Sequence, residues 1–118
     1  MVLTIPLTSE TRRLFDAPRL AKMKHGALLV NASRGAIVET EALVQSWKEG
    51  KIRAALDVTD PEPLPAGHPL WKAPNLLITP HVAGDSERFL QPAFALVREQ
   101  VERFLRREPL INIVTGEC

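Results

Sequence analysis

The sequence predicts an α/β fold built on an open, doubly wound and mostly parallel sheet. Short aliphatic runs alternate along the chain with segments of helical period, which is the pattern of βαβ units. The runs are continuous rather than alternating in polarity, as in the buried strands of a parallel sheet. With 118 residues, of which 45% are hydrophobic, the chain is long enough for one domain with a single core.

Four strands are expected, each from an aliphatic run bounded by turn residues. The first run, Met1 to Leu7, opens the chain, and the second, Ala27 to Asn31, leads into the turn Ala32-Ser-Arg-Gly35. The strands are placed at residues 2–6, 28–31, 53–57 and 76–79. Right-handed crossovers bring the carboxyl ends of such strands to one edge of the sheet, where open α/β sheets bind ligands.

Two helices are predicted between the first and second strands. Ser9 is a helix-capping residue type and favours a short helix through Leu14. Asp16 favours a second helix, which Gly26 would follow. Leu20 would then face the core, as would Met23.

Two further helices follow later in the chain. One opens at Glu39 or Thr40 and ends at Gly50. The other, over residues 86–106, has Pro92 near its start, which would kink it or delay its beginning. It carries an apolar stripe of helical period at positions 90, 94, 97, 101, 104 and 105, expected to pack into the core.

Three side chains of complementary chemistry are predicted to lie just beyond strand ends: Arg34, Glu62 and His81. A histidine can transfer a proton near neutral pH, and a carboxylate beside it orients the ring and favours its charged form. A guanidinium binds a carboxylate with two hydrogen bonds. Asp57 ends the third strand between them. This set suits the oxidation of a 2-hydroxy acid.

Three ordered motifs resemble the signatures of the D-isomer-specific 2-hydroxyacid dehydrogenases. They are Asn31-Ala-Ser-Arg-Gly35, Asp57-Val-x-x-x-Glu-Pro63 and Thr79-Pro-His81. The resemblance covers nearly the whole chain and points to the phosphoglycerate dehydrogenase and glyoxylate/hydroxypyruvate reductase branch. It implies the latter half of a Rossmann-like nucleotide-binding domain that ends in a long C-terminal helix.

The resemblance also implies roles for individual residues. Arg34 would bind the substrate carboxylate and keto oxygen, His81 would be the general acid/base, and Glu62 would orient and charge His81. NAD or NADP would be the cofactor, a small 2-hydroxy or 2-keto acid the substrate, and no metal would be needed. Asp57 would hold the nicotinamide carboxamide. The other residues implied to line the cofactor are Ile5, Pro6, Ala32, Ser33 and Gly84, together with Arg34 and His81.

The sequence lacks two features that are expected of the family. Its six glycines never form the G-x-G-x-x-G turn that holds a pyrophosphate, and no substrate-domain segment is recognisable. Residues 1–118 are therefore predicted to be one partial NAD(P)-binding domain, inactive alone, that lacks the Gly-rich half and the substrate domain. An alternative is a non-catalytic binding protein similar to the C-terminal-binding corepressors, which share this fold.

Composition and charge give expectations about binding partners, cellular location and assembly. The formal net charge of +1 favours neither nucleic acid nor an anionic membrane as partner, and no apolar run is long enough for a membrane span. The single cysteine, Cys118, points to a cytoplasmic location. The first strand would leave an open edge, which favours a homodimer or a soluble aggregate formed across it, unless the helix over residues 86–106 covers the edge. His25 and His68 are expected at the surface, and Trp47 and Trp71 in the core.

Overall fold

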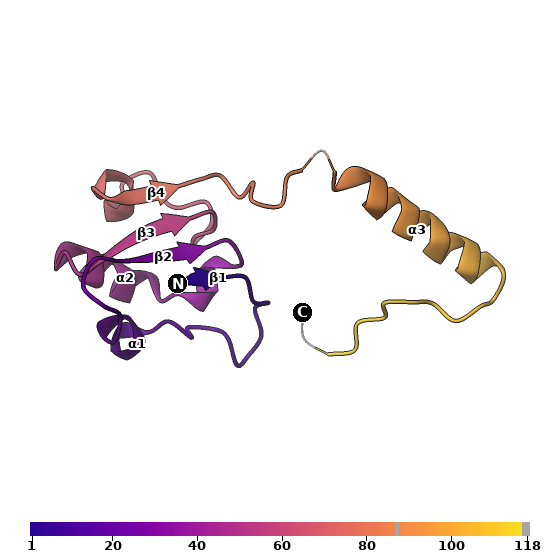
Figure 1. Ribbon diagram of the computed structural model, residues 1–118, viewed down its shortest axis with the longest axis horizontal. Helices are drawn as coiled ribbons and strands as arrows, with labels where there is room; N and C mark the ends of the chain where they lie inside the picture. The colour runs from indigo at the N-terminus through magenta and orange to yellow at the C-terminus, as the bar shows by residue number, and fades with distance from the viewer. Residues whose placement is uncertain (87, 117–118) are drawn as a thin grey trace. The chain divides into compact units, whose positions relative to one another are not determined.

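The computed structural model describes residues 1–86 and 88–116, which form two compact units (Figure 1). The first unit is Met1–Ala83 and the second begins at Gly84. Cys118 lies outside the described residues. The elements of the first unit are β1 (Val2–Leu3), α1 (Ala17–Ala21), β2 (Ala27–Asn31), the 3-10 helix η1 (Gly35–Ile37), α2 (Thr40–Lys48), β3 (Ile52–Leu56), the 3-10 helix η2 (Pro69–Lys72) and β4 (Leu76–Ile78). The second unit holds α3 (Leu90–Leu105).

The strands form one parallel sheet in the order β1-β2-β3-β4, so each strand pairs with the next along the chain (Figure 1). This confirms the predicted sheet. The first strand is shorter than predicted, because its pairing stops at Leu3, where the carbonyl accepts from Ala32 N at 3.2 Å. Pro6, which has no N–H to donate to a ladder, lies beyond it.

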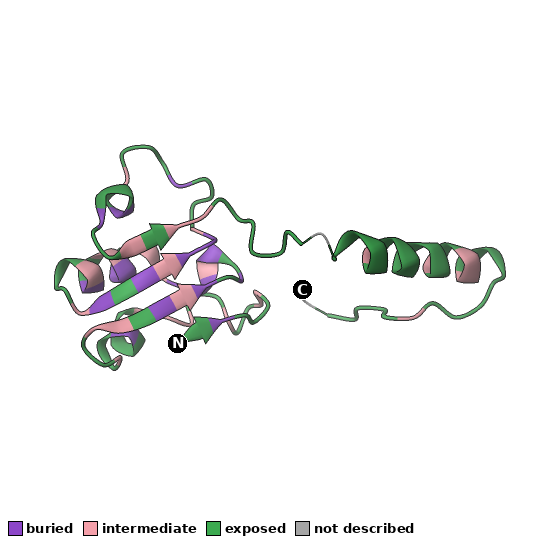
Figure 2. Cartoon of the chain, turned by 45° about the horizontal axis from the view of Figure 1, so that its top comes forward, coloured by how far each residue is buried: buried purple, intermediate pink, exposed green. Residues whose placement is uncertain are grey.

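The core of the first unit lies on one face of the sheet. Burial alternates along the strands, so that Leu29 and Ala54 are buried whereas Leu28 and Arg53 are exposed (Figure 2). α1 and α2 pack on the buried face, where they contribute Leu20 and Leu43 among other residues. Right-handed crossovers between strands that follow chain order place both helices on the same side.

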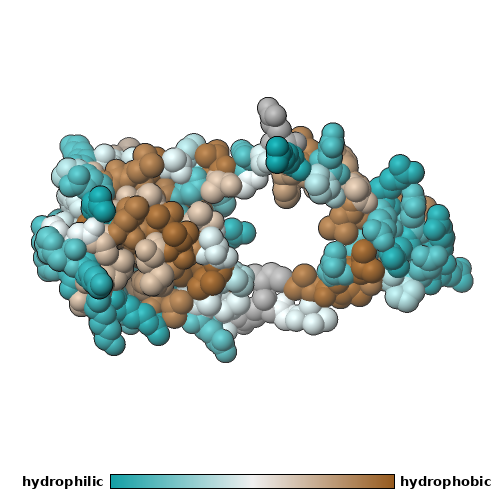
Figure 3. Space-filling view, in the orientation of Figure 1, coloured by the Kyte–Doolittle hydropathy of each residue, from teal (hydrophilic) through white to brown (hydrophobic). Residues whose placement is uncertain are grey.

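The other face of the sheet carries an apolar patch formed by Val2, Leu28 and Leu77 (Figure 3). Their exposed fractions are 62%, 41% and 60%. The predicted burial of the strands therefore holds for one face of the sheet within residues 1–83, because a continuous aliphatic run does not reveal whether a second layer covers the other face.

Of the two helix caps predicted between β1 and β2, Asp16 is confirmed and Ser9 is wrong. Asp16 accepts a hydrogen bond from Arg19 N at 2.9 Å and so caps α1. No helix forms over residues 9–14, because the Thr8 and Thr11 side chains bond to each other's backbone N–H groups and hold a turn instead. Leu20 is buried and Met23 packs against the core, as predicted.

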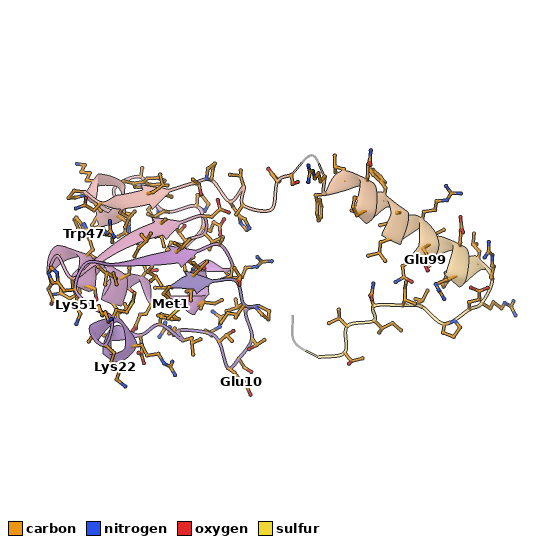
Figure 4. The ribbon with its side chains drawn as sticks, in the orientation of Figure 1. Met1, Glu10, Lys22, Trp47, Lys51 and Glu99 are labelled. Atoms are coloured by element: carbon orange, nitrogen blue, oxygen red, sulfur yellow. The ribbon has the colours of Figure 1, made fainter. Side chains whose placement is uncertain are left out.

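The second unit contains an amphipathic helix. α3 begins at Leu90 with Pro92 in its first turn, which confirms the predicted delay. Arg103 bonds to Glu99 at 3.0 Å on the polar side (Figure 4). No described residue of α3 is buried, so the prediction that its apolar stripe packs into a core is wrong within this unit; Phe94 is 72% exposed. Within the described residues, no helix is long and apolar enough to span a membrane.

Candidate active site

The predicted site residues follow three adjacent parallel strands. Arg34 lies three residues after β2, Asp57 directly after β3, and His81 three residues after β4. The parallel order places all three at the carboxyl edge of the sheet. Trp47 and Lys51 lie at the opposite end, where the strands begin (Figure 4).

Glu62 and His81 form a direct pair. His81 Nδ1 lies 2.7 Å from Glu62 Oε1, across 19 residues of sequence. A carboxylate only accepts hydrogen bonds, so Nδ1 carries the proton and donates it. Nε2 is then left to accept or donate a proton elsewhere. The His81 and Glu62 side chains are 47% and 40% exposed, which leaves the ring accessible to a ligand.

Arg34 is held by its backbone rather than by an acidic partner. Buried Asn31 shapes the turn: its Nδ2 donates to the Arg34 carbonyl at 3.0 Å, and its Oδ1 accepts from Ser33 N at 3.1 Å and Ser33 Oγ at 2.7 Å. The exposed Arg34 side chain donates from Nη1 to the Ser33 carbonyl at 2.7 Å. Among the described residues no hydrogen bond or ion pair joins Arg34 to Glu62 or to His81. The guanidinium keeps further donors for a ligand carboxylate.

Asp57 anchors the segment that carries His81. Its Oδ1 accepts from Thr79 Oγ1 at 2.5 Å and from Val82 N at 2.9 Å, and its Oδ2 accepts from Ala83 N at 2.8 Å. Asp57 is buried. The Thr79 hydrogen bond, with those from Ala83 and Val82 and the nearby His81 charge, lowers the pKa of the Asp57 carboxyl against the opposing effect of burial.

This lowered pKa predicts an acid-sensitive contribution to stability. In the unfolded chain the Asp57 carboxyl has a pKa of about 3.9. Because the folded pKa lies below that value, the contribution is fully present above about pH 4 and is lost as pH falls through the folded pKa. Urea unfolding at pH 5.5 and pH 3 should show the free-energy gap between the native chain and Asp57→Asn shrinking at the lower pH.

Asp60→Asn is the matched control for that experiment, because Asp60 is an exposed carboxyl on the neighbouring loop. Its free-energy gap to the native chain should change much less between the two pH values. An Asp57→Asn gap that stayed constant would show that the Asp57 carboxylate does not stabilise the fold through these hydrogen bonds.

Gly35 and Thr40 contact the backbone of the loop that carries Glu62. The sequence did not predict this supporting role for either residue. Thr40 Oγ1 donates to the Asp60 carbonyl at 2.6 Å. A Cβ placed on Gly35 would lie 1.9 Å from the Thr59 carbonyl oxygen, far inside contact distance. The backbone of residues 59 and 60 therefore rests directly on Gly35, and only glycine leaves room for it.

A hollow of about 390 Å³ opens beside the Glu62–His81 pair. Its apolar wall includes Leu64, Trp71 and Ile78. The prediction that Trp71 lies in the core is wrong: the residue is 49% exposed, and its Nε1 donates to the Pro65 carbonyl at 2.9 Å. Lining the wall of a pocket and filling a core require the same aromatic residue type, so composition did not separate them.

The residues predicted to hold a cofactor differ in what they can offer. Ile5, Pro6 and Ala32 are exposed beyond β1 and β2, whereas Ser33 has both its N–H and its hydroxyl bonded to Asn31. Gly84 begins the second unit. No G-x-G-x-x-G turn occurs among residues 1–86. In the same residues and 88–116, no cluster of three or more His, Cys, Asp or Glu could hold a metal ion.

Comparison with known proteins shows the family to which the chain belongs. Residues 1–83 match the family described as D-isomer specific 2-hydroxyacid dehydrogenase, NAD binding domain. A glyoxylate reductase of Thermofilum pendens is 54% identical over 80 residues, which is 67% of this chain and 24% of the relative. A D-3-phosphoglycerate dehydrogenase of Methanocaldococcus jannaschii is 40% identical over 115 residues, covering 97% of this chain and 22% of the relative.

A crystal structure gives the same result for the fold. The D-isomer specific 2-hydroxyacid dehydrogenase from Xanthobacter autotrophicus Py2, in complex with NADPH and MES, superposes with a TM-score of 0.86 at 42% identity. The alignment covers 97% of this chain and 47% of that one. The chain thus spans less than half the length of each relative compared. The chain belongs to the family of D-isomer-specific 2-hydroxyacid dehydrogenases, in its NAD-binding domain.

Proposed function

We propose that this chain forms the latter part of the NAD(P)-binding domain of a 2-hydroxyacid dehydrogenase and carries that enzyme's acid/base group. The observation that carries the proposal is the 2.7 Å pair of His81 Nδ1 and Glu62 Oε1 at the carboxyl edge of the sheet. The pair leaves His81 Nε2 to exchange a proton with a hydroxyl or carbonyl oxygen. The glyoxylate and hydroxypyruvate reductases among the relatives point to a small 2-keto acid as substrate.

In the proposed reaction His81 Nε2 takes the proton of the substrate hydroxyl as C2 loses a hydride, and returns it in the reverse direction. Bound NAD(P) supplies the hydride acceptor or donor. Glu62 keeps Nδ1 protonated and stabilises the imidazolium that forms. Arg34 grips the substrate carboxylate with its free donors and fixes the orientation of C2. The proton and the hydride leave the alcohol together, so the 2-keto acid carries no extra charge.

The proposal extends to assembly and location. β1 lies at an edge of the sheet and leaves one side of its backbone without a strand among the described residues. Such an edge favours pairing with a second subunit, so a homodimer is proposed. A cytoplasmic location is proposed because the sequence contains one cysteine and uses no disulfide.

A graft tests this function. In the Thermofilum pendens glyoxylate reductase, the segment that corresponds to the family match, residues 1–83 of this chain, would be replaced by this chain's residues. The graft should reduce glyoxylate with a nicotinamide cofactor. The isolated 118-residue chain should show no turnover and should bind NADH with about millimolar affinity or weaker, near −4 kcal/mol. Catalysis needs the nicotinamide and the substrate carbon held together, a positioning that supplies about 7–11 kcal/mol of the barrier.

Calorimetry with NADH and an absorbance assay measure both quantities, and the unmodified reductase is the control. Micromolar binding or cofactor consumption by the isolated chain would show that a partner subunit or an unrecognised loop replaces the missing half of the domain, and the proposal of an inactive partial domain would then be wrong. A graft that folds and binds cofactor without turnover would instead favour a non-catalytic binding role.

A further inference from the structure

The carboxylate of Asp57 receives hydrogen bonds from both sides of His81. Thr79 precedes the histidine by two residues and donates from its hydroxyl, while Val82 and Ala83 follow it and donate from their backbone N–H groups. The distances, 2.5, 2.9 and 2.8 Å, are those of well-formed hydrogen bonds to a charged acceptor. One buried group therefore fixes the segment at both ends.

His81 has a backbone conformation that requires such support. Its φ of +58° lies in the left-handed region, which residues with a side chain adopt at a cost. No regular strand or helix covers residues 79–83. Thr79 N donates to the Leu56 carbonyl at 2.9 Å at the start of this segment, and the hydrogen bonds to Asp57 hold the segment on both sides of the strained His81.

The same hydrogen bonds occupy most of the acceptor positions of the Asp57 carboxylate. Both lone pairs of Oδ1 are engaged by Thr79 and Val82, and one of Oδ2 by Ala83. One lone pair of Oδ2 stays free, which is enough to accept one hydrogen bond from the nicotinamide carboxamide that family resemblance assigns to Asp57. Its bonds point toward the histidine segment.

We propose that Thr79 is a positioning residue, whose hydroxyl joins the buried Asp57 carboxylate in a clamp that holds residues 79–83 and presents His81 to Glu62. The clamp itself needs no cofactor or substrate; its importance for catalysis rests on the proposed role of His81. In this role Thr79 acts through Asp57, to which its hydroxyl donates.

The test uses the 118-residue chain and nuclear magnetic resonance. Thr79→Val keeps the shape of the side chain and removes the hydroxyl. Amide exchange at Val82 and Ala83 should become about tenfold faster or more, the order expected when a hydrogen bond to a charged acceptor is lost. The His81 ring nitrogens should change from the Nδ1-protonated form to a mixture of tautomers. Exchange at Leu29 and Ala54, in the core strands, should not change.

Two further variants make the result decisive. Thr79→Ser restores a hydroxyl and should restore both slow exchange and the tautomer. Thr59→Val is the matched control, since Thr59 lines the same hollow but its hydroxyl donates to the Pro61 carbonyl and not to Asp57. Thr59→Val should leave the amide exchange rates of Val82 and Ala83 unchanged.

The proposal would be overturned by unchanged exchange and tautomer in Thr79→Val, by a failure of Thr79→Ser to restore them, or by equal acceleration in the core strands. If Thr79→Val fails to fold while Thr79→Ser behaves as the native chain, the hydroxyl is needed for more than this segment, which also counts against a local clamp. These measurements involve no turnover, so an inactive graft would leave their outcome intact.

Discussion

Replacing His81 with alanine in the active graft is expected to lower kcat by about 10²–10⁴-fold, the usual contribution of a general acid/base. Nδ1 is held by Glu62 Oε1 at 2.7 Å, so Nε2 is the ring nitrogen left to transfer the proton, and alanine removes it. Steady-state reduction of glyoxylate, followed by cofactor absorbance, measures the change.

Arg34→Ala should behave differently in the same assay. It should chiefly raise KM, with a smaller fall in kcat, because the guanidinium binds and orients substrate instead of moving a proton. His25→Ala is the control, since His25 is exposed and has no site partner, and its kinetics should match the graft. If His81→Ala kept kcat within a few-fold, another group would have to transfer the proton.

The second large effect is expected for Gly35→Ala. The added Cβ would lie 1.9 Å from the Thr59 carbonyl oxygen and 2.7 Å from Asp60 N, so backbone must move. Overpacking of this kind costs about 1–3 kcal/mol. The displaced loop carries Glu62, so the Glu62–His81 hydrogen bond should also weaken. Urea unfolding gives the stability, and the His81 ring nitrogen signals report the pair.

Gly67→Ala is the matched control for this prediction. Gly67 lies in an exposed loop of the same unit, and a Cβ there meets nothing within 4 Å. Its free energy of unfolding should stay within about 0.5 kcal/mol of the native value. Equal stability of the two alanine variants would show that residues 59 and 60 yield without cost and that Gly35 does not position the Glu62 loop.

Local patterns in the sequence were enough to predict the strands and their edge. The aliphatic runs determined where β2 and β3 lie, and a parallel sheet then placed His81 and Arg34 at the same edge. The pairing of Glu62 with His81 was predicted from chemistry, because a carboxylate can accept a hydrogen bond from a histidine ring that lies beyond the adjacent strand at the same edge of the sheet.

What escaped prediction depends on contacts distant in sequence. The approach of Thr59 to Gly35 and the bond from Thr79 to Asp57 join segments about two dozen residues apart, and no periodicity records them. Ser9 is a good cap residue by type, yet Thr8 and Thr11 satisfy the local backbone without a helix. The apolar stripe of α3 shows that a helix is amphipathic but not which surface covers it.

The chain-order sheet has a consequence for how the molecule folds. Each strand adds to the one made before it, so a growing sheet never has to wait for a distant segment of chain. The five-residue ladder of β2 and β3, with α2 between them in sequence, is the most extensive pairing and should form the folding nucleus. His81 follows β4, which lies outside that nucleus and pairs with β3 over only three residues. We therefore expect the loop that carries His81 to become ordered at the end of folding. In kinetic φ-value analysis, which compares a mutation's effect on the folding rate with its effect on stability, Thr79 should give values near zero and Leu29 high values.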